Sequence, residues 1–227
     1  MKLSVLMPVY NERERVQRAI AAVLETELPT ELELIVVDDG STDGTREILR
    51  AGGWDARVRY LEHDRNRGKG AAVRTALEQA TGEFAAIFDA DLEYDPADLA
   101  LLLPPLIEGQ TNAAFGVRAF DGYSAHSFWF VIGNRGVTLV CNLLFNVYLH
   151  DIMTCHKVIR TELFRSLELT ASGFTIEPEI TARLLSRGER IFELPVHYRA
   201  RSHEEGKKLT AYDGVRTVAT LLRCRLR

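Results

Sequence analysis

Short apolar runs alternate with helix-like stretches over the first half of the chain, and this alternation restricts the fold more than any other feature. The runs are continuous in Val, Ile and Leu, which is typical of strands covered on both faces. Strands that alternate with helices indicate a mostly parallel, doubly wound α/β sheet flanked by helices. The predicted strands are residues 3–7, 32–37, 58–61, 84–88 and 112–117, and the predicted helices are residues 12–24, 45–50, 70–80 and 96–107. Asn11 with Glu14 resembles a capping box for the first helix.

The second half is less regular. Residues 128–149 are mostly apolar and about long enough to span a bilayer by the ~20-residue rule. Arg135 lies within this stretch, and a charge inside a membrane is costly, so we expect a buried or interfacial helix instead of a spanning one. Further helices are predicted at residues 176–187 and 209–226, the latter basic and amphipathic. Residues 191–198 read as a strand at a sheet edge, because Pro195 cannot donate to a neighbouring strand.

Composition excludes several classes of protein. The chain has 227 residues, a hydrophobic content of 46% and a net charge of −4, which gives no reason to expect nucleic-acid binding. Residues 201–227 hold seven Lys or Arg against three acids, which favours an anionic partner, either a phosphate or a membrane surface. Three widely spaced cysteines without a CxxC motif indicate neither a disulfide framework nor a zinc site. We therefore expect a reducing, cytoplasmic environment.

Polar residues cluster where the first four predicted strands end. In open α/β sheets, ligands bind outside the carboxyl ends of the strands. Carboxylates there can accept hydrogen bonds from ribose hydroxyl and base N–H groups, and a Gly-Lys-Gly segment that opens a helix attracts an anion. Two aspartates after the fourth strand are hard oxygen ligands for a cation such as Mg²⁺, which proteins often hold together with substrate phosphates. In strand order, the clusters are Glu12, then Asp38 and Asp39, then Gly68-Lys69-Gly70, then Asp89 and Asp91.

The same clusters resemble glycosyltransferase family 2. The matching stretches are VLMPVYNE (5–12), VVDDGSTDGT (36–45), NRGKGA (66–71) and FDAD (88–91). The later stretches FGVR (115–118), DIMTCHKVIR (151–160), FTIEPEITA (174–182) and RARSHEEGKK (199–208) are similar to the polyprenyl-phosphate branch of that family. The resemblance implies a GT-A fold and a UDP- or GDP-linked sugar donor. It further implies a divalent metal (Mg²⁺ or Mn²⁺), inversion at the anomeric carbon and a polyprenyl phosphate acceptor.

The resemblance also implies how the chain is divided. Residues 1–227 would form a single catalytic domain, with a nucleotide-sugar half at 1–118 and an acceptor half at 119–227. The nucleotide-sugar half would use Pro8, Tyr10, Glu12, Asp38 or Asp39, Lys69, Asp89, Ala90 and Asp91. The metal would be held by Asp89 and Asp91 with Glu93 as an added ligand. The acceptor phosphate and diphosphate would face Arg118, Arg135, Lys157, Glu177, Glu179, Arg199, Arg201 and Lys207. Cys155 is a departure, because the family has a residue without Cβ there.

The acceptor decides what catalysis requires. A lipid monophosphate is mostly ionised at pH 7, since its second pKa is about 6, and it can attack without a base. Its charge would be matched by a clamp of Arg118, Arg201 and Lys207. A hydroxyl acceptor would instead need Glu177 or Glu179 as a base. With a phosphate acceptor, these two would contact sugar hydroxyls or order lysine and arginine partners. We expect His156 and His197 to be structural.

Three alternatives stay open at this point. The chain can be a glycosyltransferase for a hydroxyl acceptor, or a non-catalytic protein that binds nucleotide sugars. A nucleotidyltransferase is disfavoured, because Pro8-Val9-Tyr10 does not supply a glycine-rich loop after the first strand. The sequence leaves the sugar, the nucleotide and a homo-oligomer undetermined. We expect peripheral association with the inner face of the cytoplasmic membrane.

Overall fold

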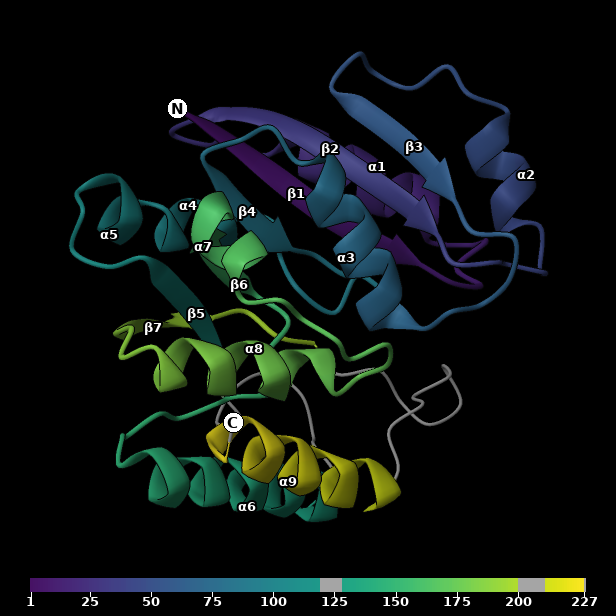
Figure 1. Cartoon of the computed structure of the whole chain (residues 1–227). Coiled ribbons are helices and arrows are strands. Elements are labelled where there is room, and N and C mark those ends of the chain that lie inside the picture. The colour runs from purple at the N-terminus through teal and green to yellow at the C-terminus, as the bar shows by residue number, and fades with distance from the viewer. Residues whose placement is uncertain (119–127, 200–210, 227) are drawn as a thin grey trace.

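The computed structural model describes residues 1–118, 128–199 and 211–226, without the side chains of 211–213 (Figure 1). Arg201 and Lys207, two members of the expected clamp, lie outside the described residues. The described strands form one seven-stranded sheet in the order β3-β2-β1-β4-β6-β5-β7. The strands are β1 (Lys2–Val9), β2 (Glu31–Asp38), β3 (Val58–Glu62), β4 (Phe84–Ile87), β5 (Ala113–Arg118), β6 (Lys157–Arg160) and β7 (Ile191–Val196).

The sheet is mostly parallel, as predicted. Parallel pairs join β1 to β2 and β4, β2 to β3, and β5 to β7. Only β6 among these strands runs antiparallel to its neighbours, β4 and β5. The predicted edge position of the strand with Pro195 is confirmed, because β7 lies at one end of the sheet. Since strands from both expected halves pair in one sheet, the division at residue 118 stays a prediction about function.

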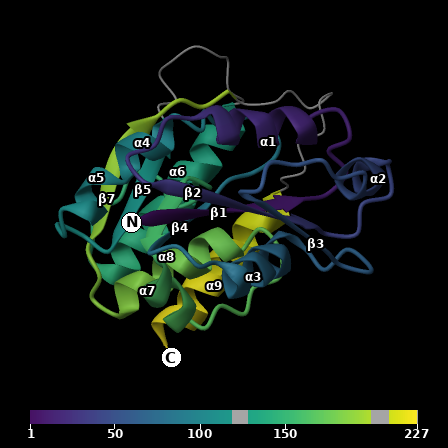
Figure 2. The ribbon, with the colours of Figure 1, turned by 90° about the horizontal axis from the view of Figure 1, so that it is seen from above.

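Helices cover both faces of the sheet (Figures 1 and 2). One face packs against α1 (Val16–Glu25), α2 (Thr45–Arg50), α4 (Asp98–Leu102) and α5 (Pro104–Ile107). The other packs against α3 (Lys69–Gln79), α7 (Thr161–Ser166) and α8 (Ile176–Ser186). Along β1, Leu3, Val5 and Met7 point into the first core and Leu6 into the second. Both faces are therefore buried, which is why the strands read as continuous apolar runs.

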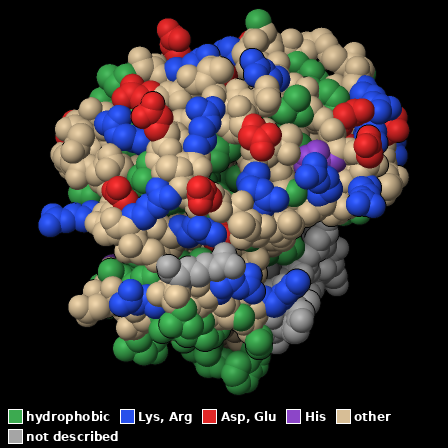
Figure 3. Space-filling model, in the orientation of Figure 1, with side chains coloured by type: hydrophobic (Ala, Val, Ile, Leu, Met, Phe, Trp, Pro, Cys, Tyr) green, Lys and Arg blue, Asp and Glu red, His purple; other side chains and the backbone are tan. Residues whose placement is uncertain are grey.

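A further layer of α6 (Phe128–Phe145) and α9 (Ala211–Arg225) packs on α8. Their shared cluster includes Cys141 on α6 and Leu221 on α9. By length and composition α6 is apolar enough to cross a membrane, yet only 11% of it is buried. Hydrophobic side chains gather at the end of the molecule where these two helices lie (Figure 3). Of the two positions expected for this stretch, buried or interfacial, the exposure of α6 argues against the buried one, and the interfacial one stays a prediction.

Two predicted helix starts differ from the structure. The first helix begins at Val16, and Asn11 is not its cap but sits in a left-handed conformation with φ 55°. The side chain of Asn11 instead accepts the amide of Thr42 at 2.9 Å. The helix predicted at 96–107 divides into α4 and α5 around Leu103, because Pro104 cannot continue the first helix.

Candidate active site

A pocket of about 320 Å³ opens at the carboxyl ends of the central strands. Most of the predicted site residues line it, as the strand-end argument requires. These residues are Pro8, Tyr10, Glu12, Asp39, Lys69, Asp89, Ala90, Asp91, Glu93, Arg118 and Glu177. Tyr94, Met153, Phe174 and Tyr198 also line the pocket and were missed, because an isolated aromatic or methionine carries no signal in the sequence. The rest of the lining is Val9, Asn66, Gly68, Cys155 and Gly173.

Five predicted residues lie elsewhere. Asp38, Lys157 and Glu179 are buried outside the lining. Arg135 and Arg199 are exposed and do not line the pocket either. For these five, direct contact with a ligand in this pocket is not supported by their positions, and the contacts of the buried three explain what they do instead.

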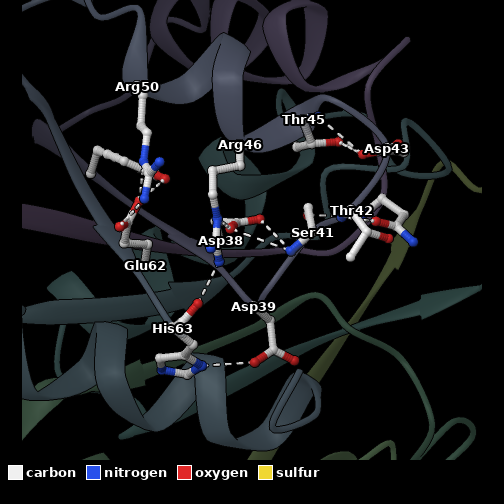
Figure 4. A network of polar contacts seen from close by, with 12 residues as sticks. Asp38, Asp39, Ser41, Thr42, Asp43, Thr45, Arg46, Arg50, Glu62 and His63 are labelled. Atoms are coloured by element: carbon white, nitrogen blue, oxygen red, sulfur yellow. Dashed lines mark hydrogen bonds and ion pairs between the residues drawn. The ribbon is translucent and has the colours of Figure 1, made fainter. Parts of the chain in front are cut away.

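Asp38 supports the loop that follows β2 (Figure 4). Its Oδ1 accepts the amide of Ser41 at 3.1 Å, and its Oδ2 accepts Nε of Arg46 at 2.7 Å. Arg46 also donates to the carbonyl of His63, which joins this loop to the end of β3. Asp38 is fully buried, so it stabilises the loop after β2, at the edge of the pocket, without lining the pocket itself.

Asp39, the next residue, fixes the loop that carries Lys69. Its Oδ1 accepts the amide of Arg67 at 2.9 Å and its Oδ2 the amide of Gly68 at 2.7 Å. Nδ1 of His63 lies 2.7 Å from Oδ1, and Nε2 lies 3.0 Å from the hydroxyl of Thr75. A neutral imidazole with its proton on Nδ1 satisfies both contacts. Asp38 and Asp39 were the two candidates for a contact with the ribose or the nucleobase. Only Asp39 lines the pocket, and its carboxylate already binds the backbone amides of the loop before α3.

The backbone at Gly68 lies close to the backbone at Ser172, in a segment that Glu179 holds in place. A Cβ on Gly68, whose φ is 92°, would come within 2.3 Å of the carbonyl of Ser172. Glu179 holds that facing segment by accepting the amides of Thr170 at 3.0 Å and Ala171 at 2.7 Å. The carboxylate of Glu179 is buried and paired with Arg183, so it is a structural anchor. The amide of Gly68 donates to Asp39 and therefore does not serve an anion.

A chain of ion pairs lies behind the pocket. Nζ of Lys69 lies 2.7 Å from Oδ2 of Asp89 and 2.9 Å from Oε1 of Glu177. Oε2 of Glu177 lies 3.4 Å from Nζ of Lys157. Burial would lower the pKa of Lys69, but the charges of Asp89 and Glu177 outweigh it and raise that pKa well above its usual value. Burial lowers the pKa of Lys157, which is fully enclosed.

The expected metal ligands are only partly assembled. Oδ1 of Asp91 accepts the amide of Glu93 at 3.0 Å, and Oε2 of Glu93 accepts the hydroxyl of Tyr198 at 2.9 Å. Within the part of the chain that the structure describes, no three His, Cys, Asp or Glu side chains lie together as a metal centre. The set Asp89, Asp91 and Glu93 is thus not gathered. The donor chemistry of Asp89 and Asp91 still fits a hard cation, because Mg²⁺ needs only one or two carboxylates when phosphate completes its shell.

Arg118 forms the opposite wall. Its Nε and Nη2 donate to Asp151 at 2.6 and 2.9 Å, a bidentate pair in which both side chains are buried. Burial disfavours the guanidinium, but the charge of Asp151 outweighs it and raises the pKa of Arg118 well above its usual value. The guanidinium carbon lies 5.1 Å from the ring centre of Tyr198 and 5.9 Å from that of Phe130, on α6. A permanent cation is therefore held rigidly between the pocket and the start of the exposed helix.

The segment 154–157 contains the departure noted in the sequence. Cys155 lines the pocket with its Sγ 3.1 Å from Nζ of Lys69. Burial and the charge of Asp89 raise the pKa of Cys155, which keeps it a thiol. The ring of His156 lies 4.4 Å from that of Tyr94, and burial lowers the pKa of His156 to about 3. Neither nitrogen of His156 has a hydrogen-bond partner among the described residues, so it is a core side chain.

His197 is structural as well. Its Nδ1 lies 2.8 Å from Oδ1 of the buried Asp98, and its amide donates to Oδ2 of the same carboxylate at 2.7 Å. This contact fastens the end of β7 to the start of α4. The expectation that both histidines are structural thus agrees with their contacts.

The fold defines the class of protein. The structure matches glucosyl-3-phosphoglycerate synthase from Mycobacterium tuberculosis, crystallised with Mn²⁺, UDP and glucosyl-3-phosphoglycerate, with a TM-score of 0.74 over 98% of this chain and 79% of that one. At 21% identity this likeness shows the fold, which is the GT-A fold of glycosyltransferases. The chain belongs to glycosyl transferase family 2, whose family model matches residues 4–168.

Two relatives bring the comparison closer to the expected branch. The chain is 26% identical to a dolichol-phosphate mannosyltransferase from Pyrococcus furiosus, over 98% of this chain and 64% of the relative. It is 29% identical to a dodecaprenyl-phosphate galacturonate synthase from Rhizobium johnstonii, over 91% of this chain and 62% of the relative. The chain thus spans less than two thirds of the length of these relatives.

Proposed function

We propose that this protein transfers a sugar from a nucleotide-diphosphate sugar to a polyprenyl phosphate, with inversion at the anomeric carbon. The observation that carries this proposal is the position of Arg118. Arg118 lines the pocket, and its guanidinium carbon lies 5.9 Å from the ring centre of Phe130 on the apolar, exposed helix α6. A lipid phosphate has a matching pair of features, an anionic head and an apolar chain.

The contacts of Glu177 and Glu179, the two candidates for a general base, also favour a phosphate acceptor over a hydroxyl acceptor. Glu177 is bound by Lys69 and Lys157, and Glu179 by two backbone amides and Arg183. Glu179 lies outside the pocket lining, and both oxygens of Glu177 face ammonium groups, which makes either carboxylate a poor base for a hydroxyl in the pocket. A phosphate monoester is mostly a dianion at pH 7, since its second pKa is about 6, and it needs no base.

The chain's own residues would then position and neutralise the reactants. Pro8, Tyr10 and Glu12 would bound the nucleoside, with Asp39 shaping the rim beside it. Arg118, held by Asp151, would align the acceptor phosphate opposite the departing diphosphate. A divalent cation held by Asp89 and Asp91 would stabilise the negative charge of that leaving group. The two relatives named above support this reading through the lipid phosphates in their names.

The test is a transfer assay with matched acceptors. UDP- and GDP-sugars are incubated with Mg²⁺ or Mn²⁺ and either a short polyprenyl phosphate or the free alcohol of the same chain. We expect a lipid-linked product from the phosphate and none from the alcohol. Transfer to the alcohol alone would establish the hydroxyl-acceptor alternative. Binding of the nucleotide sugar without transfer to either would favour the non-catalytic one.

We further propose that α6 contacts the membrane that holds this acceptor. Trp129, Leu139 and Leu143 on α6 are 78, 58 and 75% exposed, an apolar surface that water solvates poorly. Burying a leucine side chain contributes about 1.5 kcal/mol or more, so replacing both leucines should weaken partitioning at least ~10-fold. Vesicle sedimentation with anionic lipid should show this loss for Leu139→Ser with Leu143→Ser.

The matched control is Leu101→Ser on α4, because Leu101 is a 50% exposed leucine far from α6 in sequence. Its vesicle binding should equal that of the unmodified protein. Equal binding of the double variant on α6 would refute the proposed membrane contact. A cytoplasmic location and a homo-oligomer stay predictions.

A further inference from the structure

Tyr198 contacts two charged groups of the pocket at once. Its hydroxyl donates to Oε2 of Glu93 at 2.9 Å, and the guanidinium carbon of Arg118 lies 5.1 Å from the centre of its ring. Burial raises the pKa of Tyr198, and the nearby charge of Glu93 raises it further, so the hydroxyl stays protonated and remains a donor. Tyr198 therefore joins a negative side chain to the cation of the opposite wall.

The backbone around Tyr198 is fastened to the segment that carries Glu93. The amide of Arg199 donates to the carbonyl of Glu93 at 2.8 Å, and Tyr198 forms an antiparallel bridge with Tyr94. The ring centres of these two tyrosines lie 5.1 Å apart. These contacts fix the direction in which the Tyr198 ring points, although Tyr198 lies beyond the end of β7.

Glu93 was expected to be an added metal ligand, but its contacts lead to Arg118 instead. One of its oxygens accepts the hydroxyl of Tyr198, and its amide donates to Oδ1 of Asp91 at 3.0 Å. A carboxylate that accepts a phenol O–H polarises the phenol, and a more electron-rich ring attracts a cation more strongly. The charge of Glu93 therefore strengthens the contact between the Tyr198 ring and Arg118.

We propose that Glu93 and Tyr198 are positioning residues for the acceptor phosphate, with Glu93 acting through Tyr198 on Arg118. This inference rests on the proposed function, since it takes Arg118 to align that phosphate. Asp151 holds the guanidinium through two hydrogen bonds, while the guanidinium carbon lies over the ring of Tyr198. Two contacts of different geometry leave the guanidinium little freedom to turn.

The first test is a double-mutant cycle on the hydrogen bond between Tyr198 and Glu93. Initial rates of transfer give the KM for a short polyprenyl phosphate at saturating donor, and the KM for the donor at saturating acceptor. Tyr198→Phe and Glu93→Ala should each raise the acceptor KM about 5-fold, since each removes the same hydrogen bond. The double variant should raise it no further, because neighbours that share one interaction are not additive. The donor KM should stay unchanged in all three variants.

Two further variants separate the ring of Tyr198 from the charge of Glu93. Tyr198→Leu removes the ring as well and should raise the acceptor KM at least ~10-fold, the size expected for a desolvated cation–π contact. Glu93→Gln keeps an oxygen that can accept the hydroxyl, so it should raise the acceptor KM less than Glu93→Ala does.

Tyr60→Phe is the matched control. Tyr60 also donates to a carboxylate, Oε2 of Glu62 at 2.8 Å, but it lies outside the pocket lining. Both KM values of Tyr60→Phe should equal those of the unmodified protein.

The outcomes distinguish this inference from the proposed function. Additive effects of Tyr198→Phe and Glu93→Ala, or an unchanged acceptor KM in Tyr198→Phe, would overturn the inference and leave the function standing. A rise in the donor KM alone upon Glu93→Ala would do the same, because it would place Glu93 on the donor side. Absence of transfer to polyprenyl phosphate by the unmodified protein would overturn both. Tyr198→Phe and Glu93→Gln are nearly isosteric replacements, so the test holds even if Tyr198→Leu fails to fold.

Discussion

Two pairs of aspartates lie at the ends of β2 and β4, the strands on either side of β1, and they look alike in the sequence. Asp38 is the last residue of β2 and Asp39 follows it, while Asp89 and Asp91 follow β4. The side chains of Asp38 and Asp39 are 0 and 3% exposed, and protein donors surround their oxygens. The side chain of Asp89 is 18% exposed, and both Asp89 and Asp91 line the pocket.

The difference between the pairs lies in what their donors are. Asp38 and Asp39 accept backbone amides from Ser41, Arg67 and Gly68, so each carboxylate is part of a loop. Asp89 instead faces an ammonium across the pocket wall. Asp38 and Asp39 bind donors from the surrounding loops on both carboxylate oxygens, so they fix the shape of those loops. Asp89 pairs with the ammonium of Lys69, and Asp91 accepts the amide of Glu93, two residues further along the chain. Burial and donor type therefore separate the two pairs of aspartates where spacing cannot.

The sharpest test of this contrast is Asp91→Asn. Asparagine keeps the oxygen that accepts the amide of Glu93 but removes the charge that would hold a cation. We expect the transfer rate to fall about 10²- to 10³-fold, the size of effect seen when one electrostatic contact to a transition state is lost. The initial rate of lipid-linked product, at saturating substrates, measures it.

The stability of the same variant is its control. The free energy of unfolding of Asp91→Asn, from urea denaturation, should stay within ~0.5 kcal/mol of the unmodified protein. A large loss of stability would place Asp91 with the structural pair. Unchanged turnover would show that the charge of Asp91 takes no part in catalysis.

Asp39→Asn should show the reverse pattern. One of its two side-chain positions becomes an N–H donor and must face an amide of the loop, Gly68 or Arg67, or the ring of His63. A lost hydrogen bond to a charged group costs about 1.5–3 kcal/mol, so we expect a loss near 2 kcal/mol in the free energy of unfolding. Urea denaturation of Asp39→Asn and Asp91→Asn in parallel measures this loss. Equal free energies of unfolding for the two variants would refute the proposed difference between the two pairs of aspartates.

The sequence predicts the sheet because its signals are local. Apolar runs with polar ends predicted six of the seven described strands, and the shared edge followed from the rule that parallel strands end on one side. The strand that was not predicted is β6, which runs antiparallel to both of its neighbours. The edge strand followed from Pro195 alone. These inferences need no knowledge of distant contacts, and the structure agrees with them.

The side chains that lie elsewhere than expected are held by contacts between distant residues. Asn11 looks like a helix cap, but Thr42 and Ser41, 30 residues or more away, engage its side chain and its amide. Lys157 looks like a phosphate ligand, but β6 carries it into the core beneath Glu177. Glu179 and Glu177 look alike on the helix, yet only Glu177 reaches the pocket. A sequence pattern does not show which distant residue forms a hydrogen bond or an ion pair with a given polar side chain.

His156 differs from both pairs of aspartates, because it is a buried polar side chain without a hydrogen-bond partner among the described residues. His156→Phe removes two unsatisfied nitrogens while retaining an aromatic ring between Phe88 and Tyr94. Leaving a buried polar group unsatisfied costs about 1–3 kcal/mol, so we expect the variant to be stabilised by about 1 kcal/mol at pH 7. Urea denaturation at pH 7 and pH 5 measures it.

The pH dependence gives this prediction its sign. The pKa of His156 falls from 6.5 to about 3 in the folded protein, so below pH 6.5 the unfolded chain binds a proton that the folded one does not. Stability is thus lost as pH falls from 6.5 towards 3, by about 2 kcal/mol at pH 5, and His156→Phe should escape that loss.

His197→Gln is the control with the opposite sign. The hydrogen bond to Asp98 raises the pKa of His197, so the stability that this pair contributes is present at low pH and is lost as pH rises through that pKa. If the unmodified protein and His156→Phe lost equal stability between pH 7 and pH 5, the imidazole would have to be solvated or hydrogen-bonded in the folded protein.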